Sequence, residues 1–161
     1  MANPPTPKKS QIRAALVALL ERVRSGNGYW TEMGLNVSTD RKPVQEHRAG
    51  EMPRAVVTWM GEKPIEGGCL GGMGRVSCPF VIYVVVGGPR GQIQDLIDRT
   101  EQDVKRAVFS DMTLNGTAVL VSYVGSDTDQ QLLVSMDAGS QVRAQVAVTF
   151  EAQYDMTAAA P

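Results

Sequence analysis

The chain has 161 residues, the size of one ordinary domain. Hydrophobic residues make up 43% and charged residues 20% of it, a composition that predicts a folded core and excludes a disordered protein. Sixteen Lys and Arg against seventeen Asp and Glu leave a formal charge of −1, which argues against a protein that wraps nucleic-acid phosphates. No apolar run is long enough to span a bilayer and no secretory signal is visible, so we expect a protein made and kept in a cytoplasm.

A helix is predicted near the start of the chain, from Ser10 as its cap to Gly26 as its left-handed stop. Residues 1–9 before it contain three prolines and are expected to form a flexible arm. Residues 27–50 after it are rich in turn formers and are expected to hold at most a short strand over 35–38. The apolar residues of the helix recur every three or four positions and therefore share one face; they are Ile12, Ala15, Leu16, Leu19 and Val23.

Two strands are predicted around a glycine-rich stretch. Pro53 opens the first strand, residues 54–60, which is rich in β-branched and aromatic side chains. Residues 61–74 contain six of the sixteen glycines and are expected to form a long flexible loop or a wide hairpin tip. The second strand covers 75–86, and Pro79 predicts that its first part lies at a sheet edge or at a bulge.

The strand over 75–86 is apolar on both of its faces. A strand of this kind needs cover on both sides, as the central strands of layered α/β sheets have. We expect helices to cover the first face, and either long loops or a neighbouring subunit to cover the second. Because side chains alternate along a strand, the first face carries Val76, Cys78, Phe80, Ile82, Val84 and Val86, and the second carries Val81, Tyr83 and Val85.

A second helix is predicted from residue 92 to residue 109. Its charges follow the helix dipole, with Asp95 and Asp98 early and Lys105 and Arg106 late. Glu101 and Lys105 have the spacing and direction of a favourable ion pair. The apolar stripe of this helix consists of Ile93, Leu96, Ile97, Thr100, Val104, Ala107 and Val108.

Three further strands are predicted over 117–124, 131–136 and 142–151, with residues 137–140 as the turn that pairs the last two as a hairpin. The tail, residues 155–161, is expected to fray. The order of helices and strands predicts a single α/β (α+β) domain over 1–161, in which a mixed, largely antiparallel β-sheet carries two α-helices packed on one face.

The residue types that enzymes and metal sites need form no pattern in this sequence. His47 is the only histidine, which leaves no His-based triad or multi-histidine metal site within one chain, and we expect it to be exposed in a polar loop. No Lys-Ser or Lys-Thr follows the glycines of 67–74, and a strand comes next, unlike in a phosphate-binding loop. Asp127 and Asp129 are expected to be solvated turn residues. The sequence therefore predicts no catalytic residue, no cofactor and no metal.

Cys69 and Cys78 are the two cysteines, and their spacing matches no metal-ligand pattern. In a cytoplasm we expect a buried pair of reduced thiols, and a disulfide or a shared site is the alternative. Trp30, Trp59 and Tyr83 are candidates for an interface, where aromatic side chains are enriched. Because Trp59 lies within a predicted strand, we expect it in the core.

The order and spacing of these elements over about residues 10–155 resemble the tail terminator (tail completion) proteins of long-tailed bacteriophages. The matching features are the amphipathic helix through Leu20, Gly28-Tyr29, Gly34 with Val37, the strand opened by Pro53, the glycine-rich insertion, the strand Phe80 to Val86, the helix end Val104-Lys105-Arg106-Ala107-Val108, the segment Asp111-Met112-Thr113-Leu114-Asn115-Gly116, and the alternating strand through Phe150. The insertion over 61–74 departs from the family pattern in its length.

The resemblance implies a virion protein, assembled in the host cytoplasm, that forms a homo-hexameric ring on the last ring of the tail tube. Such a ring stops polymerisation of the major tail tube protein, joins the head-completion or stopper protein of the neck, and lets the genome pass through its lumen. It implies neither a membrane nor a sequence-specific nucleic-acid partner. Contacts are expected at the loop 61–74, through Glu62, Lys63, Glu66 and Arg75, and at Tyr83.

Two other functions stay open from the sequence. The nearer alternative is another neck component, the stopper or head-completion protein. The other is a small ligand-binding α/β domain or enzyme that uses residues 61–74 as a lid.

Overall fold

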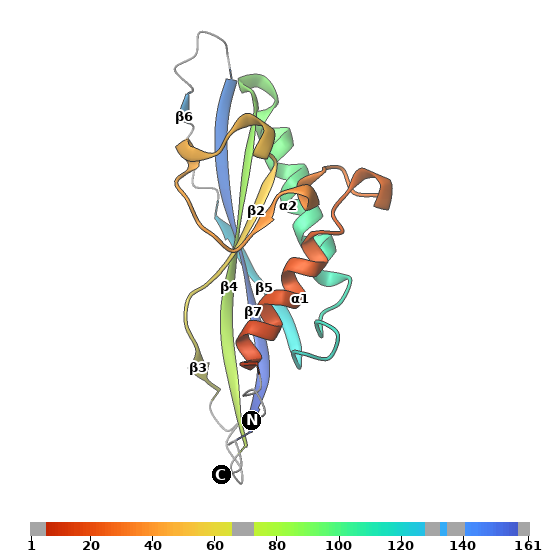
Figure 1. The fold of residues 1–161 in the computed structure, drawn as a ribbon, viewed down its shortest axis with the longest axis vertical. Helices are drawn as coiled ribbons and strands as arrows, with labels where there is room; N and C mark the ends of the chain where they lie inside the picture. Colours follow the sequence, from red (N-terminus) through yellow and green to blue (C-terminus); the bar gives the residue numbers. More distant parts are fainter. Residues whose placement is uncertain (1–5, 66–72, 128–132, 135–140, 158–161) are drawn as a thin grey trace, which may run out of the picture.

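The computed structural model describes residues 6–65, 73–127, 133–134 and 141–157. Two long strands, β4 (Met73–Pro89) and β7 (Gln141–Thr157), pair antiparallel along all of their length and form the centre of the sheet (Figure 1). β2 (Arg54–Trp59) lies antiparallel beside β4, and β1 (Val37–Ser38) lies parallel beside β2. On the other side, β5 (Leu120–Asp127) lies antiparallel beside β7.

Two short strands complete the sheet. β3 (Lys63–Pro64) pairs with β4, and β6 (Leu133–Val134) pairs with β7, both antiparallel. The strand order is β1-β2-β4-β7-β5, with the parallel β1–β2 pair as the exception to antiparallel pairing, so the prediction of a mixed, largely antiparallel sheet is confirmed. Single-turn 3₁₀ helices occupy links between these elements, at Ser25–Asn27, Met33–Leu35, Val44–Glu46, Ala49–Glu51 and Arg90–Gln92.

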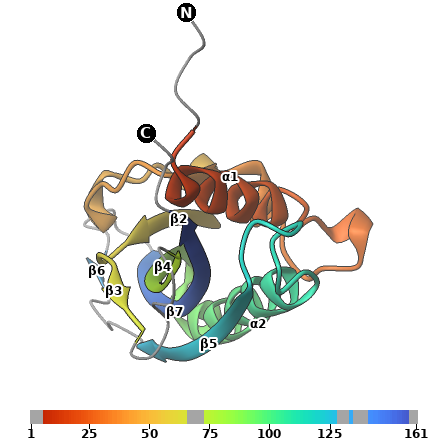
Figure 2. The ribbon, with the colours of Figure 1, turned by 90° about the horizontal axis from the view of Figure 1, so that it is seen from below.

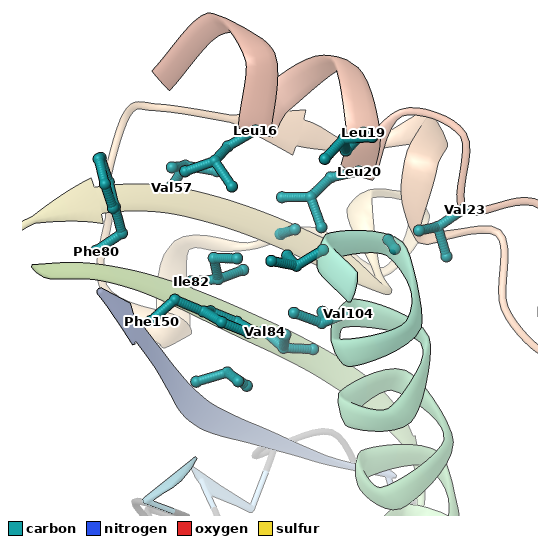
Figure 3. Packing of buried hydrophobic residues seen from close by; sticks show 14 of the residues in the cluster. Leu16, Leu19, Leu20, Val23, Val57, Phe80, Ile82, Val84, Val104 and Phe150 are labelled. Carbon is teal, nitrogen blue, oxygen red and sulfur yellow. The ribbon is translucent and has the colours of Figure 1, made fainter. Parts of the chain in front are cut away.

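Both α-helices, α1 (Lys8–Leu20) and α2 (Ile93–Phe109), pack on the same face of the sheet, as predicted (Figure 2). The first face of β4 meets them: Ile82 and Val84 lie in one buried cluster with Leu16 and Val104 (Figure 3). Leu96 packs against this cluster from α2. The helix-facing residues of β7 join the same core, and burying their apolar surface between the sheet and the helices stabilises the fold. They are Val142, Ala144, Val146, Val148, Phe150, Ala152 and Tyr154.

The ends of α1 differ from the predicted ones. Pro7, not Ser10, is the N-cap, and its carbonyl accepts hydrogen bonds from Ser10 N–H and Gln11 N–H at 2.9 and 3.2 Å. The helix therefore begins at Lys8, within the predicted arm, because proline is compatible with a helix start, where a backbone N–H has no partner. At its other end the helix stops before Gly26, and the left-handed residue is Gly28, with φ of 82°.

The long strands extend further than the sequence predicted. β7 runs through Asp155 to Thr157, inside the predicted fraying tail, because these residues pair with Met73–Arg75 of β4. Pro79 lies in the central strand β4 and opposite Glu151 of β7, so it is not at a sheet edge. The predicted alternative, a bulge, fits the irregular pairing on the other side of β4, where residues 60–62 stand opposite residues 78–79. On the side of β4 that faces β2 and β3, Pro79 lies between the residues that pair with β3 and those that pair with β2. The missing N–H of proline therefore removes no hydrogen bond between strands.

The other predicted element boundaries differ less from those in the structure. β5 begins at Leu120 instead of residue 117. The predicted pairing of the last two strands is confirmed by β6 and β7, while the turn 137–140 lies outside the described residues. Within the part of the chain that is described, no helix has the length and apolar character needed to cross a membrane.

Candidate assembly surface

The second face of β4 is covered by a segment of the same chain. Val81 and Val85 are buried, and residues 39–53 run over this face of the sheet (Figure 1). The Arg41 guanidinium lies 4.0 Å from the centre of the Tyr83 ring, and the Met52 side chain lies against Gly87. Of the two covers that the sequence left open, the loop therefore covers this face at Tyr83 and Gly87, and Tyr83 remains half-buried.

His47 lies inside this loop and is buried, so the prediction of an exposed histidine is wrong. Its side chain is 1% exposed, and neither ring nitrogen has a hydrogen-bond partner among the described residues. Burial, together with the positive charges of Arg54 and Lys42, lowers the pKa of His47. The polar neighbours of His47 in the sequence suggested exposure, but the loop turns this one residue toward the sheet.

Glu51 is the ionic centre of the same loop. Its Oε2 lies 3.0 Å from Lys42 Nζ, 3.6 Å from Arg54 Nη1 and 3.9 Å from His47 Nδ1. The Arg48 N–H also donates a hydrogen bond to this oxygen, at 3.1 Å. The Lys42 contact first, and then the Arg48 bond, lower the pKa of Glu51, so the carboxylate is charged where it holds the loop closed.

Three of the five predicted contact residues lie together around β3 and the start of β4. The Glu62 carboxylate accepts a hydrogen bond from the Tyr154 hydroxyl and lies 3.3 Å from Lys9 Nζ. Arg75 Nε donates to Asp155 Oδ1 at 2.8 Å. Lys63 is exposed in β3. Glu66 lies outside the described residues, and Tyr83 lies apart from this group, under the loop 39–53.

The groups around Glu62 are shifted by their contacts. The Tyr154 hydrogen bond lowers the pKa of Glu62, and burial raises the pKa of Tyr154. Burial also raises the pKa of the Cys78 thiol. Cys69 lies outside the described residues, so the buried pair of reduced thiols stays a prediction. Trp59, predicted to be in the core, is half-buried with its ring centre 5.7 Å from that of Phe80.

A set of large apolar side chains is exposed along the outer strand β5 and the end of α2. Tyr123 and Phe109 both contact Phe150 of the core, with ring centres 5.7 and 6.2 Å apart, so these two rings are held in place from beneath. Because β5 is the last strand in the sheet order, the exposed side chains that β5 carries lie at a sheet edge. We call this set the β5 patch; its members, each 38–60% exposed, are Phe109, Met112, Val119, Leu120, Tyr123 and Val124.

Sequence reasoning missed the β5 patch. The alternation of residues 117–124 does not indicate that this strand ends the sheet. Because β5 lies at the edge, no further strand lies beside it to cover its side chains. Edge strands of monomers are ordinarily blunted by charges or proline, and β5 carries neither before Asp127. An apolar sheet edge of this kind is typical of a surface that another chain covers.

A buried carboxylate on α2 was also missed. Asp103 accepts hydrogen bonds from Trp30 N–H, Thr31 N–H and the Thr31 hydroxyl at 3.0, 2.9 and 2.8 Å. It thereby fixes the link after α1 and presents Trp30, a candidate interface residue, with 57% of its surface exposed. The available signal was an aspartate at a position that the apolar stripe of α2 passes through, between Thr100 and Ala107.

Two clefts lined by described residues bring no set of catalytic groups together. One, of about 250 Å³, lies beside Met52, Gly87 and Val142, and Arg143 is the ionisable residue in its lining. Another, of about 380 Å³, lies between α1 and residues 111–117, and its ionisable residues are Arg22 and Asp111. The described residues contain no group of three or more His, Cys, Asp or Glu side chains placed to hold a metal ion.

Comparison with known proteins gives a likeness of structure alone. The chain matches no protein-family model and no curated protein sequence. Among solved structures it is similar to a chain of the virion of a native gene transfer agent (GTA) particle, with 13% sequence identity and a TM-score of 0.37. The alignment covers 92% of this chain and 92% of that chain. With these values the likeness does not extend to function.

Proposed function

We propose that this protein is a structural subunit of a tailed-phage virion, a tail terminator that assembles as a ring on the end of the tail tube. The observation that carries the proposal is the β5 patch, six large apolar side chains left exposed on the edge strand β5, on the residue before it and at the end of α2 and just beyond. Exposed apolar surface of this kind favours association with another chain, because burying it removes apolar area from water. We assign the β5 patch to the contact between neighbouring copies.

The tube contact is assigned to a different part of the molecule, around β3 and the start of β4. Lys63 is exposed there, and the ion pairs of Glu62 with Lys9 and of Arg75 with Asp155 give this end a fixed pattern of charges. Glu66 follows β3 in the sequence and is included in this proposal, as is Tyr83 for a contact beside the loop 39–53. The ring would be a hexamer, with the genome passing through its lumen and the neck protein on its other face.

The first experiment tests assembly of the chain alone. Sedimentation velocity of the purified protein should give a ring-sized species, or monomers that convert to rings on addition of tail tubes. Val124→Lys places a charge at the most exposed member of the β5 patch, 60% exposed, and should abolish this species without unfolding the domain. Gln102→Lys, the same charge on the exposed side of α2, is the matched control and should assemble normally.

The second experiment distinguishes a terminator from its alternatives. Purified tail tube protein is polymerised with and without this protein, and tube lengths and ends are viewed by electron microscopy. A terminator shortens the tubes and is seen on their ends. A stopper or head-completion protein leaves tube length unchanged, and so does a monomeric ligand-binding domain, either of which would contradict the proposal.

A further inference from the structure

Residues 39–53 are attached to the sheet almost entirely by side chains. The hydrogen bonds from backbone to backbone that residues 40–52 make in the described structure are all one-turn steps inside the loop, such as Glu46 N–H to Pro43 O and Met52 N–H to Ala49 O. A loop with no share in the sheet ladder can leave the sheet without breaking it. The loop can therefore open independently of the rest of the domain.

The side-chain attachments lie at the two ends and the middle of the loop. Near its start, the Arg41 guanidinium stacks on Tyr83 of β4. In its middle, Arg143 of β7 donates a hydrogen bond to the Gln45 carbonyl at 2.8 Å. At its end, Glu51 binds Lys42 within the loop and Arg54 of β2.

His47 is the buried titratable group within this loop. Neither of its ring nitrogens has a hydrogen-bond partner among the described residues. Burial, which is the largest effect, and the charges of Arg54 and Lys42 oppose a protonated ring, whereas the Lys42 backbone and the Glu51 charge favour it. The charged groups that face the ring are Glu51 of the loop at 3.9 Å, Lys42 earlier in the loop, and Arg54 of β2. Both cations are already bound to Glu51, which leaves a positive excess around the ring. A protonated imidazole is therefore poorly accommodated in the closed loop.

We propose that residues 39–53 form an acid-sensitive cover, which protonation of His47 releases from the second face of the sheet. Release removes Met52 from Gly87 and frees Tyr83 from Arg41 on that face. The proposal does not depend on the virion function, because it concerns the loop and the sheet of one chain.

The direction of the effect follows from linkage. In the open loop His47 is in water with an ordinary pKa near 6.5, and in the closed loop its pKa is lower. The open state therefore binds the proton more readily, so the open-to-closed ratio rises as the pH falls below about 6.5. Between pH 7.5 and pH 5.5 this ratio should rise, and about tenfold is the upper limit, which a closed ring that stays neutral over that range would give.

The test uses the full chain and two measurements. Because His47 is the only histidine, its ring carbon-bound protons give a single assignable pair of NMR signals that report its titration. Amide hydrogen exchange, corrected for the intrinsic effect of pH, reports opening of residues 40–52 and of β4 separately. We expect His47 to titrate below 6.5 and exchange in the loop to rise, by up to about tenfold, from pH 7.5 to pH 5.5, while exchange in β4 stays constant.

Two variants sharpen the result. His47→Phe fills the buried site and cannot take up a proton, so its loop should exchange at the same slow rate at both pH values. Glu46→Gln removes an exposed titratable group from the same loop and should behave as the wild type. If His47→Phe does not fold, the wild-type measurements decide. Unchanged loop exchange, or a rise in loop and β4 exchange together, overturns the proposal.

Discussion

The Asp103 carboxylate accepts two hydrogen bonds from Thr31, one from its backbone N–H at 2.9 Å and one from its hydroxyl at 2.8 Å. These bonds join α2 to the link after α1 across 72 residues of sequence, and both side chains are buried. A buried carboxylate with this many donors is a stable anchor, and removing it leaves the donors without a partner.

Asp103→Ala should therefore destabilise the domain strongly. We expect a loss of about 2–4 kcal/mol in the free energy of unfolding, because buried donors to a charged acceptor are left unpaired. Asp95→Ala is the control, since it removes an exposed carboxylate that pairs with Arg99 on the same helix and should have little effect. Urea denaturation of both variants measures the difference, and equal stabilities would show that Asp103 is not an anchor.

Any side chain at Gly34 is predicted to destabilise the domain for a steric reason. A Cβ at this position would lie 2.5 Å from the Glu21 carbonyl oxygen and 2.7 Å from that of Val23, and backbone cannot easily move away. Gly34→Ala should cost about 1–3 kcal/mol of stability through overpacking. Gly26→Ala, at a glycine with no atom within 4 Å of such a Cβ, should leave the melting temperature near the wild-type value. A Gly34→Ala protein as stable as Gly26→Ala would refute this packing argument.

The two faces of β4 should respond differently to a charge. Ile82→Asp puts an unpaired carboxylate in the core between the helices and the sheet, and we expect the variant to be unfolded. Tyr83→Asp keeps a half-buried position where Arg41 can pair with the new carboxylate, so we expect a folded protein with a modestly lower melting temperature. Circular dichroism melts compare the two. Unfolding by both would mean that the loop 39–53 leaves no room for a charge on the second face.

Tyr154 predicts a loss of stability in alkali. Its pKa is raised, mainly by burial and then by its hydrogen bond to Glu62, above the ordinary value near 10. A group whose pKa is higher in the folded state contributes stability that is complete below pH 10 and is lost as the pH rises toward the folded-state pKa. Tyr154→Phe should therefore lose less stability than the wild type between pH 8 and pH 11, measured by urea denaturation. Parallel losses in the two proteins would contradict the assignment.

Local patterns in the sequence determined the elements and the side of each that is buried. The alternation of Phe80, Ile82 and Val84 and the helical spacing of Ile97, Val104 and Val108 predicted the core correctly, because both follow from backbone geometry alone. The same patterns gave the largely antiparallel sheet and the two helices on one face.

Only the tertiary structure decided what covers the second face of β4, which strand ends the sheet, and where the lone histidine lies. Each depends on contacts between residues far apart in the chain: Arg41 reaches Tyr83, and the edge position of β5 exposes Tyr123 and Val124. His47 has polar neighbours in sequence and is nevertheless buried, because the loop that carries it packs on the sheet at Tyr83 and Gly87, more than thirty residues later. Burial is set by this packing, which residue type and local spacing do not encode.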